Sequence, residues 1–338
     1  MRNFFNIFVF IVIIPLSSCV REEQLPNTAS GNFEELWKII DERYCFLEYK
    51  EIDWDGIYTH YEKYIYSDMP DDELFNILGR MLAELKDGHV NLYSDSEVTY
   101  YTSWYDDYPR NFNEILLMTY LGMKHRSEGS IRYTILPENT GYIYCGNFSE
   151  TMNNERINVI LTEMADCNGL IIDMRNNSGG SIGNAVLLAS HFTDKKVLTG
   201  YIQHKTNKGH NSFSTPKAIY IDPTSGVYWS KPVVVLSNRH TFSAGNYFVN
   251  TMRYFPQVTT VGDITGGGSG LPFTSELPNG WGVRFSSSPH YDAEMNHIEF
   301  GIEPDYPVNL NPSDEEKGID TIIEKARFLL NNPTLFSK

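Results

Sequence analysis

The chain has 338 residues, which is long enough for one large domain with a smaller appended unit. Hydrophobic residues make up 41% of the chain, as expected for a globular protein with a substantial core. The formal net charge of −16 argues against binding to nucleic acid, or to an anionic membrane surface by charge, because both would repel the protein.

The N-terminus has the pattern of an export signal followed by a tether. An apolar run over 4–16 follows Arg2, too short for an ordinary membrane-spanning helix but typical of a secretory signal. The run ends in "LSSC", which resembles the bacterial lipobox, where the cysteine is lipidated after cleavage. We therefore expect a lipoprotein signal peptide over 1–18, lipidation of Cys19 and a polar tether over 19–30. A plain signal peptide or a retained N-terminal anchor is the alternative.

Two amphipathic helices are predicted next, and they define a helical N-terminal domain over 31–89. The first begins at Asn32, which has the spacing of a capping box with Glu35. The second lies within 69–89 and is opened by Pro70 and two acidic residues. Both carry apolar residues at helical spacing, so each has a face to bury.

The rest of the chain divides into an irregular segment and an α/β core. Residues 90–140 are rich in aromatic residues without a clear period, so we expect connecting strands and loops there. Over 141–338, apolar strands alternate with helices, which predicts an α/β fold with a covered, largely parallel sheet. The predicted strands are 140–148, 169–175, 232–238, 258–263 and 280–288, and the predicted helices are 150–167, 179–192, 244–255 and 314–331.

The sequence gives no sign of a metal or a cofactor. The cysteines outside the signal have no C-x-x-C pair and no other metal-like spacing. The glycine-rich turns lack the dinucleotide-binding pattern and are followed by no phosphate-binding lysine. We therefore expect no cofactor and no metal.

Two strand–turn–helix junctions carry polar residues where the predicted strands end. Ligands bind at this edge of the sheet in α/β folds. One strand ends at Asp173 and is followed by the turn that contains Gly179 and Gly180. The other leads into "NRHTFSAGNYF" (238–248), where Ser243 precedes a helix. These residues alone leave two interpretations of this serine open, a helix N-cap or a nucleophile.

His89 follows the second predicted helix, just before a strand. A lone histidine is more often structural than catalytic, so it matters here only if folding brings it to Ser243.

Together these segments resemble the tail-specific and tricorn-like serine peptidases, the C-terminal processing peptidase family (S41). The resemblance covers roughly residues 33–310. The matching segments stand in family order: "LKDGHVNL", "GLIIDMRNNSGGS", "NRHTFSAGNYF", "VGDITGGGSGLP" and "GIEPDYPV". One match would be weak, whereas all of them in order are specific.

The resemblance implies a crotonase-like α/β core with a small helical N-terminal domain. It also implies a serine endopeptidase that acts on peptides or proteins and needs no cofactor. Its nucleophile would be Ser243 and its base His89. The oxyanion hole would be formed by the Ala244 N–H with Gly179 or Gly180.

This chain departs from the family pattern at two places near the proposed base. The Ser/Lys branch carries a lysine base where this chain has Gly268, so His89 is the remaining family-consistent base. The tricorn-type site has a serine directly before the histidine, and here that residue is Gly88. The group that orients the histidine is therefore open. Glu299 is our candidate for the acidic member, with Glu303 or a plain salt bridge as alternatives.

About 50 residues separate His89 from the strand at Gly141, fewer than the PDZ domain of many relatives needs. We therefore expect no PDZ domain. Two other functions stay open: a catalytically inactive peptide- or ligand-binding protein on the same fold, and crotonase-type chemistry on an acyl-thioester. The expected location is the cell envelope, as a periplasmic or outer-membrane lipoprotein. The sequence leaves substrate specificity and oligomeric state open.

Overall fold

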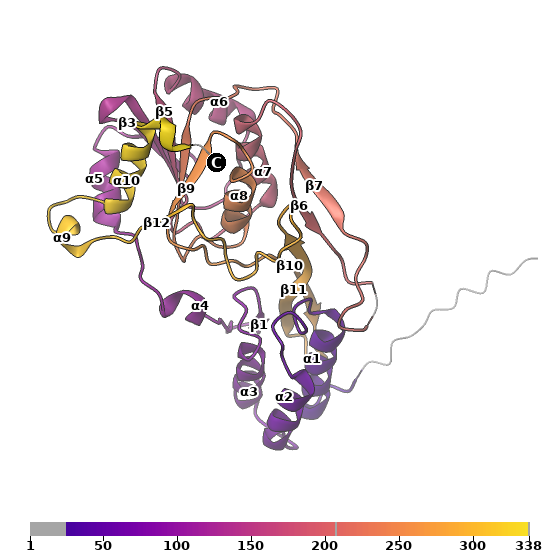
Figure 1. Cartoon of the computed structure of the whole chain (residues 1–338). Helices are drawn as coiled ribbons and strands as arrows, with labels where there is room; N and C mark the ends of the chain where they lie inside the picture. The colour runs from indigo at the N-terminus through magenta and orange to yellow at the C-terminus, as the bar shows by residue number, and fades with distance from the viewer. Residues whose placement is uncertain (1–24, 207, 337–338) are drawn as a thin grey trace, which may run out of the picture.

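Figure 1 shows the fold as a computed structural model, in which residues 25–206 and 208–336 are described. A helical unit, coloured indigo, packs against a larger α/β core. The expected signal peptide and Cys19 lie outside the described residues. Within those ranges, no helix combines the length and the apolar character needed to cross a bilayer.

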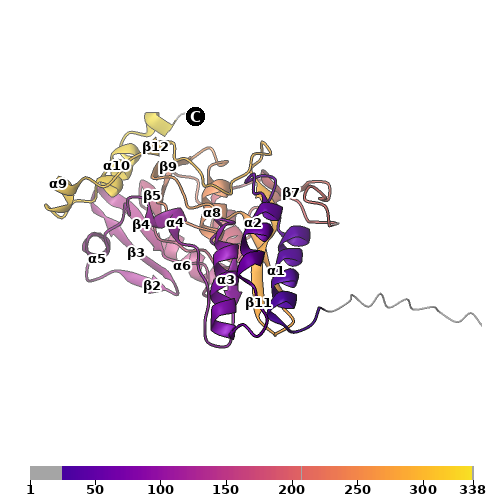
Figure 2. The same cartoon turned by 90° about the horizontal axis from the view of Figure 1, so that it is seen from below.

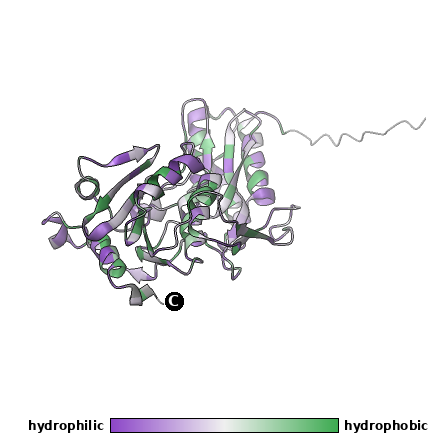
Figure 3. Cartoon of the chain, turned by 90° about the horizontal axis from the view of Figure 1, so that it is seen from above, coloured by the Kyte–Doolittle hydropathy of each residue, from purple (hydrophilic) through white to green (hydrophobic). Residues whose placement is uncertain are grey.

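The helical unit is formed by the segment between residues 25 and 93. Its elements are α1 (Ala29–Arg43), α2 (Trp54–Tyr61), the one-turn helix η1 (Glu62–Tyr64), α3 (Asp71–Ala83) and β1 (Asn91–Tyr93). The apolar stripes of the helices face each other, and Leu36, Ile40 and Leu78 are fully buried between them. The hydropathy colours of Figure 3 show both hydrophobic and hydrophilic residues on these helices.

The first helix begins earlier than the sequence predicts. Thr28 is its N-cap and accepts a hydrogen bond from the Gly31 N–H at 3.1 Å. Asn32 instead lies inside the helix and donates its side-chain amide to the Thr28 carbonyl at 2.8 Å. The predicted capping box at Asn32 is therefore wrong, because a better cap stands four residues upstream.

Within the described residues, the main sheet has seven strands in the order β12-β9-β8-β5-β4-β3-β2. The strands from β4 to β12 in this order run parallel, and β3 and β2 are antiparallel additions. Their bounds are β2 (Arg126–Glu128), β3 (Ile131–Leu136), β4 (Thr140–Cys145), β5 (Gly169–Asp173), β8 (Val233–Ser237), β9 (Val258–Gly262) and β12 (Tyr306–Pro307). The predicted α/β fold is confirmed.

Helices cover both faces of this sheet, which explains the continuous apolar runs of its central strands. Leu170, Ile172, Val233 and Val235 pack under α6 (Asn154–Glu163), α7 (Ile182–Ala189) and α8 (Ala244–Met252). The alternating residues Ile171, Val234 and Leu236 pack against α5 (Glu114–Leu121) and α10 (Thr321–Leu330) on the other face. The remaining short helices are α4 (Ser103–Asp106), η2 (Pro137–Asn139), η3 (Ser190–Phe192), α9 (Pro312–Glu315) and η4 (Pro333–Phe336).

A second sheet joins the core to the helical unit. Its strands are β1, β6 (Val197–Ile202), β7 (Lys217–Ile221), β10 (Gly270–Glu276) and β11 (Gly282–Tyr291), in the order β1-β11-β6-β7 with β10 also paired to β11. Figure 2 shows β11 running beside α1 and α3. Val283 and Phe285 bury their side chains in the core of the helical unit. The chain segments just after α3 and near the C-terminus therefore meet in one sheet.

Candidate active site

Ser243 lies in a tight turn between β8 and α8. Its backbone has φ 55 and ψ −119, and the Gly245 N–H donates to the Phe242 carbonyl at 2.9 Å across the turn. These are the values of the first central position of a type II′ turn, a position that favours glycine. Ser243 precedes the helix but its side chain caps no backbone N–H. This backbone conformation costs free energy for a serine, and such strain indicates a functional constraint.

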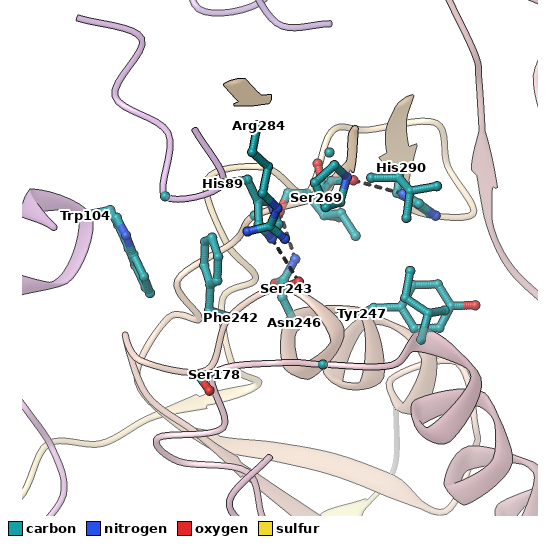
Figure 4. Close-up of a pocket in the computed structure, with 18 residues that line it drawn as sticks. His89, Trp104, Ser178, Phe242, Ser243, Asn246, Tyr247, Ser269, Arg284 and His290 are labelled. Atoms are coloured by element: carbon teal, nitrogen blue, oxygen red, sulfur yellow. Dashed lines mark hydrogen bonds between the residues drawn. The ribbon is translucent and has the colours of Figure 1, made fainter. Parts of the chain in front are cut away.

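The fold brings His89 to Ser243. His89 Nε2 lies 3.0 Å from Ser243 Oγ, although the two residues are 154 positions apart in the chain. Figure 4 shows them approaching from opposite sides, His89 from the loop between α3 and β1 and Ser243 from the start of α8. The imidazole packs on the Phe242 ring, with centroids 4.7 Å apart, and Trp104 stacks on the other side of that ring at 4.2 Å.

The imidazole of His89 is almost completely enclosed, with 4% of the residue exposed. Burial lowers the pKa of His89 to about 4, and the positive charges of Arg284 and Lys50 act in the same direction while Asp87 opposes them. At neutral pH the ring is therefore uncharged and can accept a proton from the serine. Among the described residues, its buried Nδ1 has no hydrogen-bond partner.

A buried ionic cluster lies behind His89, formed by Asp87, Lys50 and Glu299. Asp87 accepts hydrogen bonds from the His89 backbone N–H at 2.8 Å and from the hydroxyls of Tyr44 and Ser286, both at 2.9 Å. The Lys50 ammonium lies 3.6 Å from Asp87 and 2.8 Å from Glu299. The cluster fixes the backbone that carries the histidine.

The pKa values of the two carboxylates in this cluster shift in opposite directions. Burial opposes ionisation of Asp87, but Lys50 and the hydrogen-bond donors outweigh it, so the pKa of Asp87 is lowered. Burial raises the pKa of Glu299, and the neighbouring Asp87 charge adds to this. A single ammonium therefore pairs with both buried carboxylates and neutralises the charge of only one of them.

Glu299 is not placed as the acid that orients the imidazole. Its carboxylate accepts a hydrogen bond from the Ser269 backbone N–H at 2.7 Å and pairs with Lys50. Both oxygens of the Glu299 carboxylate are thus engaged by Ser269 and Lys50 and not by the His89 ring, as the salt-bridge alternative predicts. The other candidate, Glu303, is exposed. Of the alternatives that the sequence left open, the structure therefore shows Glu299 in a salt bridge with Lys50 and not as the acidic partner of His89.

Backbone N–H groups at the two turns form a candidate oxyanion site. Ala244 begins α8, so its N–H has no partner within the helix. The N–H of Gly179 is taken by the Asn177 side chain at 2.9 Å, which leaves Gly180 of the two alternatives for the second donor. Gly180 lines the pocket at Ser243 and stays a candidate. Gly179 has another role, because a Cβ there would lie 2.7 Å from the Cβ of Ser243.

Gly268 also lines the pocket, at the position where the Ser/Lys branch has its lysine. It has φ 75, and a Cβ there would lie 2.3 Å from the Phe242 ring. This ring is the one that supports His89. A side chain at this position would therefore require the ring to move, which agrees with a site built around a histidine.

The pocket beside Ser243 has a volume of about 470 Å³. Apolar side chains line much of it, including Trp104, Leu271 and Ile298. Its polar residues include Arg284 and His290, which Figure 4 shows near His89 and Ser269. The volume is sufficient for side chains of a bound peptide.

Sequence analysis missed three residues of this site. Asp87 lies in the quoted segment "LKDGHVNL", two positions before His89, but no role was assigned to it. Lys50 and Arg284 lie in segments with no motif, and only the tertiary structure brings them to the site.

Comparisons with known proteins identify the family. Residues 139–308, about half of the chain, match Peptidase family S41, and residues 26–83 match the Tricorn protease C1 domain. The chloroplastic carboxyl-terminal-processing peptidase 2 of Arabidopsis thaliana is 27% identical over 207 residues, covering 59% of this chain and 38% of the relative. The carboxy-terminal processing protease CtpA of Bacillus subtilis (strain 168) is 26% identical over 174 residues, covering 51% and 35%. The chain thus spans less than half the length of these curated relatives.

Solved structures match over a larger share of the chain. A crystal structure from Parabacteroides merdae, of a protein described as a candidate peptidase, has 47% identity and a TM-score of 0.86, covering 90% of this chain and 96% of that one. Mature CPAF matches with a TM-score of 0.67 over 90% of this chain and 98% of that one, and its 13% identity shows a shared fold alone. From the family match over half its length, the chain belongs to peptidase family S41.

Proposed function

We propose that this protein is a serine endopeptidase in which Ser243 is the nucleophile and His89 the general base. The observation that carries the proposal is the 3.0 Å distance between Ser243 Oγ and His89 Nε2. This is within the range that proton transfer requires. Membership of peptidase family S41 supports the same reaction class.

The proposed reaction is acyl transfer in two halves. His89 Nε2 takes the proton of Ser243 Oγ as that oxygen attacks the peptide carbonyl, and the imidazolium then protonates the leaving amine. The oxyanion is held by the N–H groups of Ala244 and Gly180, and one such donor typically contributes about 100- to 1,000-fold in turnover. Water, deprotonated by His89, then attacks the ester carbonyl, and the serine oxygen leaves with the returned proton.

The test is cleavage of a broad peptide library, read by mass spectrometry, with His89→Ala beside Lys86→Ala. The histidine variant is expected to lose most of the turnover, because no other base among the described residues contacts the Ser243 hydroxyl. Lys86 is an exposed lysine three positions away, and its variant should cleave like the wild type. Loss of turnover in Lys86→Ala but not in His89→Ala would show that the base is misassigned. No cleavage by the wild type would favour a binding protein.

On the acid side, kcat/KM should fall at an unusually low pH. His89 must be neutral to act as base, and its pKa is about 4 in the free protein. We expect kcat/KM for a non-titrating peptide to stay level from pH 7 to about 5 and to fall only as pH drops through about 4. An ordinary histidine would give this fall near pH 6.5. Intrinsic fluorescence measured at each pH separates unfolding from titration, and a limb near 6.5 in folded protein would contradict the assignment.

We further propose that the protein is exported and anchored in the cell envelope by a lipid on Cys19. The proposal rests on the apolar run that ends at "LSSC". The Cys19→Ser variant should appear in the soluble fraction after cell fractionation, whereas Ser18→Ala, which keeps the cysteine, should stay with the membranes. Membrane-bound Cys19→Ser protein with an intact N-terminus would instead indicate a retained anchor.

A further inference from the structure

Arg284 lies on the face of β11 that is turned toward the active site. Side chains alternate along a strand, and its neighbours Val283 and Phe285 both enter the core of the helical unit. Arg284 therefore points to the opposite side, where it lines the pocket that contains Ser243 and His89. Figure 4 shows its side chain extending toward these two residues.

Arg284 is half-buried, and its guanidinium has no partner in the described part of the chain. No carboxylate there forms an ion pair with it, and no oxygen there accepts a hydrogen bond from it. Two more deeply buried arginines do have partners. Arg175 pairs with Asp173 and Asp320, and Arg239 donates to backbone carbonyls, including that of Trp104. A partly buried cation without a partner loses part of its hydration without compensation, so a ligand with a negative charge would stabilise it.

Among the described residues that line the pocket, Arg284 is the side chain that carries a charge at pH 7. No aspartate, glutamate or lysine is present among the described residues that line the pocket. Burial lowers the pKa of the two histidines, His89 and His290, so both are neutral at pH 7. The carboxylates of Asp87 and Glu299, which pair with Lys50, do not line the pocket. The pocket lining therefore carries the positive charge of Arg284, although the protein as a whole carries a net charge of −16.

We infer that Arg284 is a specificity-determining residue that binds a carboxylate of the peptide substrate close to the scissile bond. The inference rests on the proposed peptidase function. The planar guanidinium suits a carboxylate because it can donate two parallel hydrogen bonds. The carboxylate can come from an aspartate or glutamate side chain or from the free C-terminus of the substrate.

The experiment compares matched peptides that differ only in this carboxylate. One pair is blocked at both ends and carries glutamate or glutamine next to the cleaved bond. The other pair has no acidic side chain and ends in a free carboxylate or an amide. The kcat/KM ratio within each pair is measured for wild type, Arg284→Gln, Arg284→Lys and Arg80→Gln. Arg80 is an exposed arginine on α3, so its variant changes the net charge equally without touching the pocket.

Wild type and Arg80→Gln should prefer the carboxylate in at least one pair by about 10- to 100-fold, the value of one charge-assisted contact. Arg284→Gln should remove this preference, mainly through KM, and Arg284→Lys should restore part of it. The pair that responds identifies the source, either the acidic side chain or the chain end. The inference fails if neither pair shows a preference, or if Arg284→Gln slows both members equally, since that would place its effect on His89.

Binding gives a second measurement that needs no turnover. Fluorescently labelled versions of the same peptides are titrated into Ser243→Ala protein with arginine or glutamine at position 284. A carboxylate preference that depends on Arg284 supports the inference even if the wild type cleaves nothing, in which case only the peptidase proposal fails. Equal affinities within each pair would overturn the inference while leaving a cleaving wild type as a peptidase.

Discussion

Ser243→Ala is expected to lower peptide turnover by about a millionfold, the scale seen when a serine nucleophile is removed from a serine peptidase. The reason is that no other hydroxyl occupies the strained turn 3.0 Å from the imidazole. Stability should fall by only about 1 kcal/mol, because one hydrogen bond is lost. A fluorophosphonate probe, which reacts with activated serines, should label the wild type and leave the variant unlabelled.

Ser243→Gly is the matched control for the turn itself. It should be as inactive as Ser243→Ala, but it should melt at a higher temperature. Glycine adopts φ 55 and ψ −119 without strain, whereas alanine keeps the Cβ that makes this conformation costly. Equal probe labelling of wild type and both variants would mean that another residue reacts, and the nucleophile assignment would be lost.

Lys50→Met should have the largest effect on stability. The lysine side chain is 5% exposed, and its ammonium is the cation between Asp87 and Glu299. Methionine fills a similar volume but leaves two buried carboxylates facing each other. Breaking a buried ion pair in this way costs about 3–5 kcal/mol. We expect a loss of this size in urea unfolding, accompanied by lower activity because His89 is attached to the Asp87 segment.

Two further variants separate this effect from a general loss of charge. Adding Glu299→Gln to Lys50→Met should recover part of the stability, because one of the unbalanced carboxylates becomes neutral. Lys63→Met, at an exposed position of the same unit, should change stability by no more than about 0.5 kcal/mol. If Lys50→Met unfolds at the same urea concentration as Lys63→Met, the cluster contributes nothing to stability.

The parts of the fold that could be predicted are those with a local cause. Strands β4, β5, β8 and β9 are short apolar runs between helices, and burial on both faces produces that pattern. The contact between His89 and Ser243 is long-range, and only the order of several motifs along the chain suggested it. The predicted helix over 314–331 is divided into α9 and α10, with Gly318 at φ 75 between them.

The parts that could not be predicted depend on tertiary partners. Strands β6, β7 and β10 are half-exposed, so burial on both faces does not mark them in the sequence as it marks the central strands of the main sheet. The sequence could not decide between Gly179 and Gly180 as the second donor, whereas in the structure the Asn177 side chain takes the Gly179 N–H. Lys50 shows no helical period and no motif, and its role exists only because Glu299, far along the chain, is packed against it.

The pairing of β1 with β11 has a consequence for the order in which a new chain matures. Asn91 is paired with Arg284 in these strands. Strand β1, which follows the first helices, can therefore pair only when β11, near the other end of the chain, is present. Contacts of such long sequence separation form late in folding. His89 lies two residues before β1, and Asp87, which accepts its backbone N–H, also accepts a hydrogen bond from Ser286 of β11. We therefore expect the contact between Ser243 and His89 to form only after β11 has been synthesised and paired with β1.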